Sequence, residues 1–265
     1  MYEFDYRRAV SVADAVAELK KTPDAKLLAG GMTLLPTLKM RLAQPSELVD
    51  LGAIAALKGI TIADAHVTIG AMTRHADVAA SQDLRAALPA LCDLAAGIGD
   101  PQVRYRGTMG GSVANDDPAA DYPAACLGLG ATIVTDRREI AADDFFLGLF
   151  QTALDEDEII TAIRFPRPLG AAYEKFKNPA SRYATVGVFV ARFADGVRVA
   201  VTGAGSDGVF RARDLEQALA AHFAPEAAAS VAISSEGVAS DMHGSAEYRA
   251  HLIPVLAARA VGACK

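Results

Sequence analysis

The chain has 265 residues, 52% of them hydrophobic, which is enough apolar material for one large or two small globular domains. A formal net charge of −6 and a pI near 5.4 argue against a nucleic-acid-binding surface. The sequence has no apolar run of the roughly 18 residues that a membrane helix needs, and no apolar signal-peptide core follows Met1. We therefore expect a cytoplasmic protein without a membrane span.

The first part of the sequence predicts a small βαβ-like unit. Ser11 precedes residues 12–20, whose apolar side chains recur at helical spacing, and would cap that helix. A short apolar strand at 26–29 runs into Gly30-Gly31, after which Thr33 would cap a helix over 34–42. A second strand at 47–50 completes the unit.

The middle of the chain alternates short strands and helices. We expect strand pairs at 60–63 with 67–70 and at 131–135 with 139–142, and a strand at 159–165. The predicted helices cover 73–80 with Thr73 as the cap, 84–96, and 116–127 with Asp116 or Asp117 as the cap and Pro118 in the first turn.

A Pro/Gly cluster at 166–170 is the predicted domain boundary. After it, segments 172–177, 186–193 and 197–203 predict a three-stranded antiparallel sheet, with Asp195-Gly196 as a hairpin turn. The Ala-rich remainder predicts helices at 214–222, 225–231 and 245–262. Residues 168–265 would therefore form a small α+β domain.

Two diglycine loops carry the strongest chemical signal. Gly30-Gly31 lies within Ala29–Leu35, and Gly110-Gly111 lies within Gly107–Ser112. Glycines at the start of a helix leave backbone amides uncovered, and such amides bind phosphate groups. A single diglycine loop is more often an ordinary turn, so the signal is the presence of both.

Polar residues cluster after the second loop, at Asn115, Asp116, Asp117 and Asp121. Helix capping would explain one of the acids, and Asp121 could accept hydrogen bonds from a ribose or polyol or be a surface acid. The acidic run 155–158 predicts a solvated turn. The five histidines are scattered, the three cysteines have no metal-ligand spacing, and no nucleophile motif is present. These absences favour chemistry supplied by a bound cofactor.

Segments 29–35 and 108–123 together resemble the FAD-binding medium subunit of molybdenum hydroxylases, the family of aerobic carbon monoxide dehydrogenase and xanthine dehydrogenase. Between these two segments, 68–73 and 100–104 also occur in the family's order. The resemblance implies an α+β architecture: a two-subdomain PCMH-type FAD-binding fold at 1–167, divided near residue 55, followed by a C-terminal domain at 168–265 of the carbon monoxide dehydrogenase flavoprotein type.

The resemblance also implies the residues that contact FAD. The first loop and Thr33 would bind the pyrophosphate with the second loop, Asp121 the sugar part, Lys177 the flavin ring, while Met32 departs from the Gln or His that the family often carries. The complete implied set is Ala29, Gly30, Gly31, Met32, Thr33, Leu34, Ile98, Thr108, Gly110, Gly111, Ser112, Asp121, Ile160, Lys177 and Tyr183. We expect Gly110→Val to abolish FAD binding while the fold is largely retained.

The implied function is electron transfer rather than substrate turnover in this chain. A partner subunit with 2Fe-2S clusters would deliver electrons from a molybdopterin subunit to FAD, which would pass them to NAD⁺, a quinone or oxygen, in a heterotrimer that is often doubled. A free-standing PCMH-type flavin oxidoreductase and a scaffold without a cofactor are the alternatives. The sequence leaves the substrate and the electron acceptor open.

Overall fold

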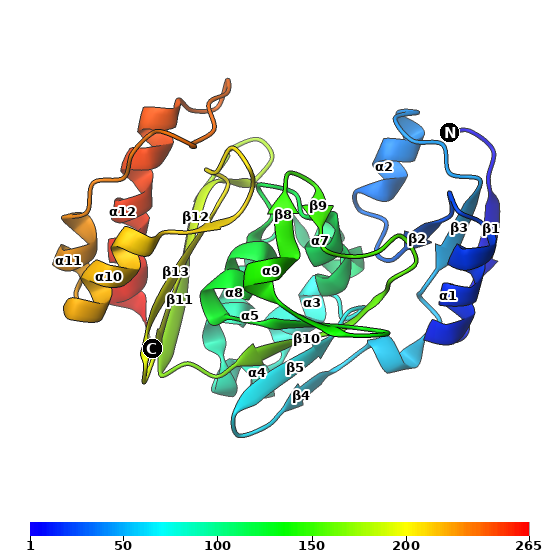
Figure 1. Ribbon diagram of the computed structural model, residues 1–265, viewed down its shortest axis with the longest axis horizontal. Helices are drawn as coiled ribbons and strands as arrows, with labels where there is room; N and C mark the ends of the chain where they lie inside the picture. The colour runs from blue at the N-terminus through cyan, green and yellow to red at the C-terminus, as the bar shows by residue number, and fades with distance from the viewer. Residues whose placement is uncertain (265) are drawn as a thin grey trace.

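The computed structural model describes residues 1–264 and arranges them in three parts along its longest axis (Figure 1). The N-terminal part lies at one end, a central part of sheet and helices follows, and the C-terminal helices lie at the other end. Each part has its own cluster of buried apolar side chains.

The N-terminal part is a three-stranded parallel sheet of order β1-β3-β2 with two helices. Its elements are β1 (Asp5–Arg8), α1 (Val12–Lys21), β2 (Lys26–Leu28), α2 (Leu34–Lys39), β3 (Glu47–Asp50) and a 3-10 turn (Ala55–Leu57). The predicted βαβ unit is confirmed, and the Ser11 hydroxyl caps α1 by accepting from the amide of Asp14 at 3.1 Å. Strand β1 escaped prediction because its side chains are exposed and carry no apolar alternation.

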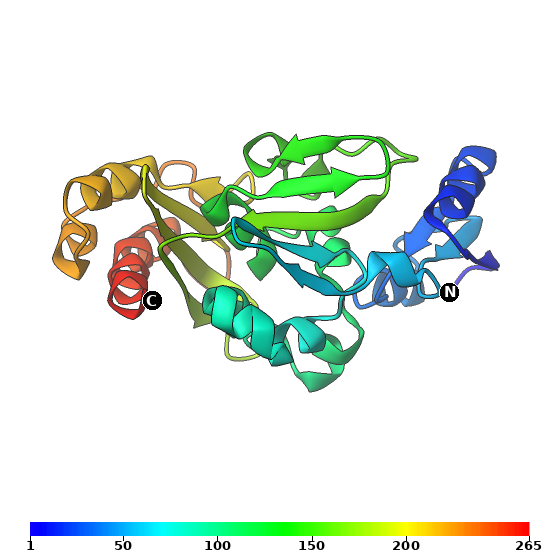
Figure 2. The same ribbon diagram turned by 90° about the horizontal axis from the view of Figure 1, so that it is seen from below.

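The central part is a five-stranded antiparallel sheet of order β4-β5-β10-β6-β7, seen from below in Figure 2, together with helices and a small hairpin. Its strands are β4 (Ile60–Ile62), β5 (His66–Gly70), β6 (Thr132–Thr135), β7 (Glu139–Ala141) and β10 (Ile160–Pro166), and the hairpin is β8 (Phe146–Gly148) with β9 (Gln151–Thr152). Its helices are α3 (His75–Ala80), α4 (Gln82–Ala87), α5 (Pro89–Ala96), α6 (Pro101–Arg106), α7 (Met109–Asn115), α8 (Asp121–Leu129) and α9 (Ala142–Phe145).

The C-terminal part is a four-stranded antiparallel sheet covered by helices. Its elements are β11 (Gly170–Lys177), β12 (Ala184–Phe193), β13 (Gly196–Thr202), β14 (Phe210–Arg211), α10 (Arg213–Ala221), α11 (Pro225–Ala229) and α12 (Ala246–Ala263). The three predicted strands are present, but the two-residue strand β14 adds a fourth that is too short for a sequence pattern.

Strand β12 shows how the central and C-terminal parts are joined. Val186, Val188 and Val190 pack with the C-terminal helices, while Phe189 and Ala191 on the opposite face belong to the central core. Alternate side chains of a strand point to opposite faces, so one strand serves two cores. Helix α8 has every residue buried and lies against β12 and β13, as a helix that is apolar on all sides must. The central core thus extends across the predicted boundary at 166–170.

Three predicted helices begin or end differently from what the sequence suggested. Pro89 divides the predicted helix 84–96 into α4 and α5, because proline has no amide to donate and clashes with the preceding turn. Helix α8 begins at Asp121 rather than at 116, because Asp116 instead ends α7 in a left-handed conformation with φ 44°. Helix α3 begins after Arg74, and the predicted cap, Thr73, bonds through its hydroxyl to the backbone of Gly59.

Candidate functional site

A cavity of about 1080 Å³ is lined by residues from the N-terminal part, the central part and the loop 179–183. Every residue in the FAD-contact set implied by the sequence lines it except Lys177. The two diglycine loops, about eighty residues apart in the chain, are in direct contact: a Cβ at Gly30 would lie 2.3 Å from the carbonyl oxygen of Arg106. The structure therefore brings both loops into one wall of one cavity.

The first loop presents free backbone amides to this cavity. Among the described residues, no oxygen accepts a hydrogen bond from the N–H groups of 30–33, and all of these residues line the cavity. Gly31 adopts φ +74°, a conformation that favours glycine. Thr33 occupies the N-cap of α2, but its hydroxyl makes no capping bond, so the predicted side-chain cap is wrong and that hydroxyl has no helix amide as its partner. Uncovered amides in series form an anion-binding concavity.

The second loop differs, because its amides are already used within the chain. Met109 donates to the carbonyl of Thr73 at 3.0 Å, Gly110 to that of Ala71 at 2.8 Å, and Gly111 to the hydroxyl of Thr108 at 3.2 Å. The hydroxyls of Thr108 and Ser112, rather than these amides, are the groups that this loop can offer to a ligand.

The close contact with Ala71 also changes the role of Gly110. A Cβ on Gly110 would lie 2.5 Å from the Cβ of Ala71, so the space around this glycine is filled by the protein itself. The expectation that Gly110→Val would leave the fold largely intact is therefore wrong, because the larger side chain meets the buried core before it meets any ligand.

Asp121 is buried and paired with two side chains of β11. Its carboxylate accepts from the hydroxyl of Tyr173 at 2.5 Å and from the ammonium of Lys175 at 2.9 Å, and Lys175 is itself only 4% exposed. Burial raises the pKa of Asp121, against the opposing effect of Lys175. The alternative of a surface acid is excluded, and any sugar that Asp121 contacts would share its carboxylate with these two donors.

Lys175 lines the cavity, whereas Lys177 does not. Residues two apart on a strand share a face, but the pairing of β11 with β12 shifts between Phe176 and Lys177. The extra residue of this bulge, Thr185, lies on β12, and Lys177, at the end of β11, is exposed. The sequence signal for Lys175 was therefore present in the alternation of β11, but the bulge was not visible in it.

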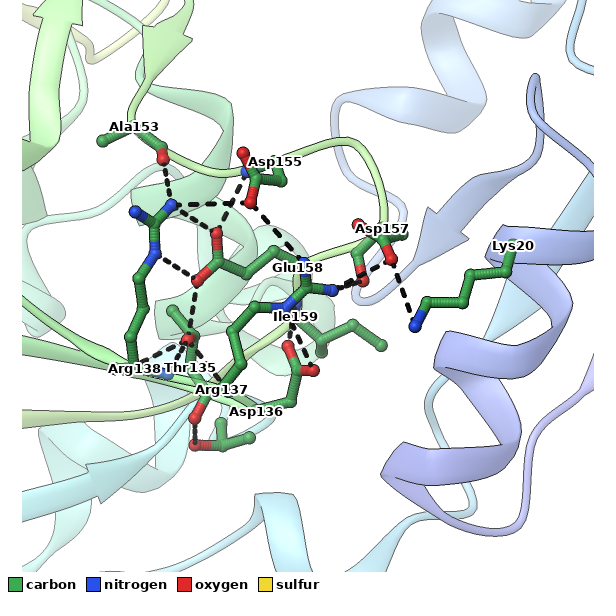
Figure 3. Close-up of polar contacts among 11 residues, drawn as sticks. Lys20, Thr135, Asp136, Arg137, Arg138, Ala153, Asp155, Asp157, Glu158 and Ile159 are labelled. Atoms are coloured by element: carbon green, nitrogen blue, oxygen red, sulfur yellow. Dashed lines mark hydrogen bonds and ion pairs between the residues drawn. The ribbon is translucent and has the colours of Figure 1, made fainter.

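The acidic segment 155–158 borders the cavity, and Arg137 and Arg138 form ion pairs with its carboxylates (Figure 3). Figure 3 shows Arg138 against both carboxylate oxygens of Glu158, at 2.9 and 2.7 Å, while the Thr135 hydroxyl donates to the same carboxylate at 2.7 Å. These donors, led by Arg138, hold the pKa of Glu158 at about 2. The Asp157 carboxylate lies 3.6 Å from the ammonium of Lys20 in α1, so this ion pair links the acidic segment to the N-terminal part. The prediction of a solvated turn is wrong for Glu158, whose side chain is fully buried.

His75 lies beneath the second loop and also contributes to the cavity wall. Its amide donates to the carbonyl of Gly107 at 3.0 Å, and a Cβ on Gly107 would lie 2.5 Å from its Nε2. Burial, with a smaller effect from Arg104, lowers the pKa of His75 to about 4, so the imidazole is neutral at pH 7. We take His75 as support for the loop rather than as a charged ligand group.

The donor set suits an elongated anionic ligand with polar and flat parts. Free amides at 30–33 suit a pyrophosphate, the Asp121–Lys175 pair suits hydroxyls and carbonyls, and half-exposed Tyr183 suits a flat ring. Among residues 1–264, no group of histidine, cysteine and acidic side chains could hold a metal ion, and no helix is long and apolar enough to cross a membrane.

Comparison with known proteins gives consistent matches over the whole chain. Residues 2–168 match the family model described as the FAD binding domain in molybdopterin dehydrogenase. The chain is 39% identical to the carbon monoxide dehydrogenase medium chain of Hydrogenophaga pseudoflava, covering 98% of this chain and 96% of that one. Its structure is similar to a chain of reconstituted CO dehydrogenase from Oligotropha carboxidovorans (TM-score 0.90, 38% identity, 98% and 97% covered). It is also similar to a chain of quinoline 2-oxidoreductase from Pseudomonas putida 86 (TM-score 0.90, 28% identity, 99% and 96% covered).

Proposed function

The chain belongs to the FAD-binding medium subunits of the molybdenum hydroxylase family, and from this premise we propose that it binds FAD in the cavity and transfers electrons within a multi-subunit oxidoreductase. The observation that carries the proposal is the set of free amides at 30–33 facing a cavity large enough for a dinucleotide. When bound, the flavin would supply the redox chemistry, and the chain would supply binding and orientation.

The chain's own residues have distinct parts in this proposal. The amides of 30–33 bind the pyrophosphate, and the hydroxyls of Thr108 and Ser112 add donors from the second loop. Asp121 contacts the sugar part of the cofactor. The ammonium of Lys175, held by Asp121, would be a buried cation for the flavin part, and Lys177 remains a second candidate. Ile98, Ile160 and Tyr183 provide apolar or aromatic contacts to the two ring systems.

The division of labour with partner subunits is the finer part of the proposal. Among the described residues, this chain has no metal-binding cluster of its own, and the relatives it resembles over nearly their full length are medium chains or subunits by name. We propose a small partner with 2Fe-2S clusters as the electron donor, a molybdopterin partner that oxidises the substrate, and a cytoplasmic dimer of heterotrimers. NAD⁺, a quinone or oxygen would be the external acceptor.

A titration and an activity assay test this function directly. The purified chain should bind one equivalent of FAD, show flavin absorbance, and melt at a higher temperature when FAD is present, because a ligand that binds only the folded state stabilises it. It should not oxidise small alcohols without partners. Failure to take up FAD would refute the proposal, and strong activity of the chain alone would support the free-standing flavin oxidoreductase instead.

A further inference from the structure

Two residues with a strained, left-handed backbone line the cavity. Among residues 1–264, four non-glycine residues have a left-handed backbone: Arg41, Asp116, Phe150 and Arg182. Phe150 (φ 54°) and Arg182 (φ 62°) line the cavity, and the carbonyl of Asp116 (φ 44°) accepts from the amide of Phe150 at 3.1 Å. Such strained conformations persist where the surrounding structure imposes them, often at ligand sites.

Phe150 is the least expected of these residues. It lies in the tight turn between β8 and β9, a hairpin beside α7 (Figure 1), where a left-handed residue is normally glycine or asparagine. A bulky aromatic residue with positive φ is an outlier. The residue is 61% exposed although it lines the cavity, so its apolar ring leaves a large area that a ligand in the cavity could bury.

Its neighbours in the hairpin separate two explanations for this exposure. Leu147 and Leu149 are similarly exposed, at 58% and 50%, but they do not line the cavity. A surface that served only to dock another protein would use all three side chains alike. Of these three residues, only Phe150 lines the cavity, and it has the left-handed backbone.

A second aromatic residue, Tyr183, follows the strained Arg182 in a loop that is closed by hydrogen bonds. Tyr183 is 49% exposed and lines the cavity. Asn178 closes its loop, because its amide donates to the carbonyl of Tyr183 at 2.8 Å and its side-chain oxygen accepts from Ala180 and Ser181. Asp117 also lines the cavity and helps burial to raise the pKa of Tyr183, which places it near that ring. Since the Asp116 carbonyl accepts from the amide of Phe150 and Asp117 lies near Tyr183, segment 116–117 lies between the two aromatic residues.

We infer that Phe150 is a contact for the isoalloxazine ring, held at the mouth by the strained β8–β9 turn. This inference rests on the proposed function and adds a residue that the FAD-contact set implied by the sequence does not contain. Of the two ring systems of FAD, the one at the mouth must be the redox-active ring, because electrons have to reach it from outside the chain. An apolar ring against its face or edge buries area and excludes water.

Phe150→Gly tests the contact without threatening the fold. Glycine suits the left-handed backbone at 150, so the variant should unfold at the same or a higher denaturant concentration than the wild type. FAD should bind about tenfold more weakly, as expected for a lost aromatic contact. ADP, which carries only the adenine and pyrophosphate half, should bind equally well to both proteins. Leu149→Ala, in the same turn, is the matched control and should change neither affinity.

Each outcome has one meaning. If the wild type binds ADP and FAD but Phe150→Gly binds FAD with unchanged affinity, the inference is overturned while the proposed function stands. If the variant loses affinity for ADP to the same extent, Phe150 contacts the adenine half and the inference is likewise overturned. If the wild type itself takes up no FAD, the proposed function is refuted, and the inference that rests on it is refuted with it.

Discussion

The clearest quantitative prediction concerns Glu158, the buried acid of the network in Figure 3. We consider Glu158→Gln, which keeps the size of the side chain and removes its charge. The carboxylate accepts from Arg138, Thr135 and the amide of Asp155, so the variant loses charge-assisted hydrogen bonds and turns one acceptor into a donor.

The size of the effect follows from the pKa. The pKa of Glu158 falls from an ordinary 4.5 to about 2, and one pKa unit corresponds to about 1.4 kcal/mol. The ionised carboxylate therefore contributes at most about 3.5 kcal/mol to the free energy of unfolding. Because Arg138 is 45% exposed and partly screened by solvent, we expect a loss of about 2 kcal/mol at pH 7.

The pH dependence gives the sharper assay. A depressed acid pKa stabilises the fold above the unfolded-state value, and this stability is lost as the pH falls from about 4.5 toward 2. Urea unfolding from pH 7 to pH 3 should show the difference between wild type and Glu158→Gln shrinking through this range. Lys20→Met, which removes an exposed partner of Asp157, is the control and should cost less than about 1 kcal/mol. A difference that stays constant from pH 7 to pH 3 would refute the assigned role of the charge.

Three further predictions use the same unfolding assay. Lys175→Met leaves the buried Asp121 carboxylate without its cation and should cost about 3–5 kcal/mol, whereas Lys177→Met, at an exposed position, should cost less than about 0.5 kcal/mol; equal effects would contradict the pairing. Gly110→Ala should cost about 1–3 kcal/mol even without FAD, because the new Cβ overpacks the core, and wild-type stability would contradict that close approach. Burial lowers the pKa of His75 from 6.5 to about 4, so the free energy of unfolding should decline as the pH falls from 6.5 toward 4. His75→Gln should abolish that part of the decline. An unchanged dependence of the unfolding free energy on pH in this variant would contradict the prediction.

Much of the fold follows from local sequence patterns. The helix capped by Ser11, the hairpin of β6 with β7 and the long strands β11 to β13 are confirmed near their predicted bounds. Each depends on interactions between residues close in sequence: a cap, a tight turn, or alternation along one strand. Where a distant partner decides, as for the exposed strand β1 that pairs with β3, local pattern is insufficient.

The sequence by itself determined the two diglycine loops and the acid Asp121, and so the kind of ligand to look for. Only the tertiary structure decided how these residues act. The amides of 30–33 are free while those of 109–110 are engaged, because the carbonyls of 71 and 73 accept from the second loop, whereas no carbonyl of residues 1–264 accepts from the first. Lys175 rather than Lys177 bonds Asp121, because the Lys175 side chain is buried against that acid beside Tyr173, whereas Lys177 is exposed at the end of β11. Hydrogen-bond satisfaction and burial depend on neighbours distant in the chain, and no periodicity of the sequence encodes them.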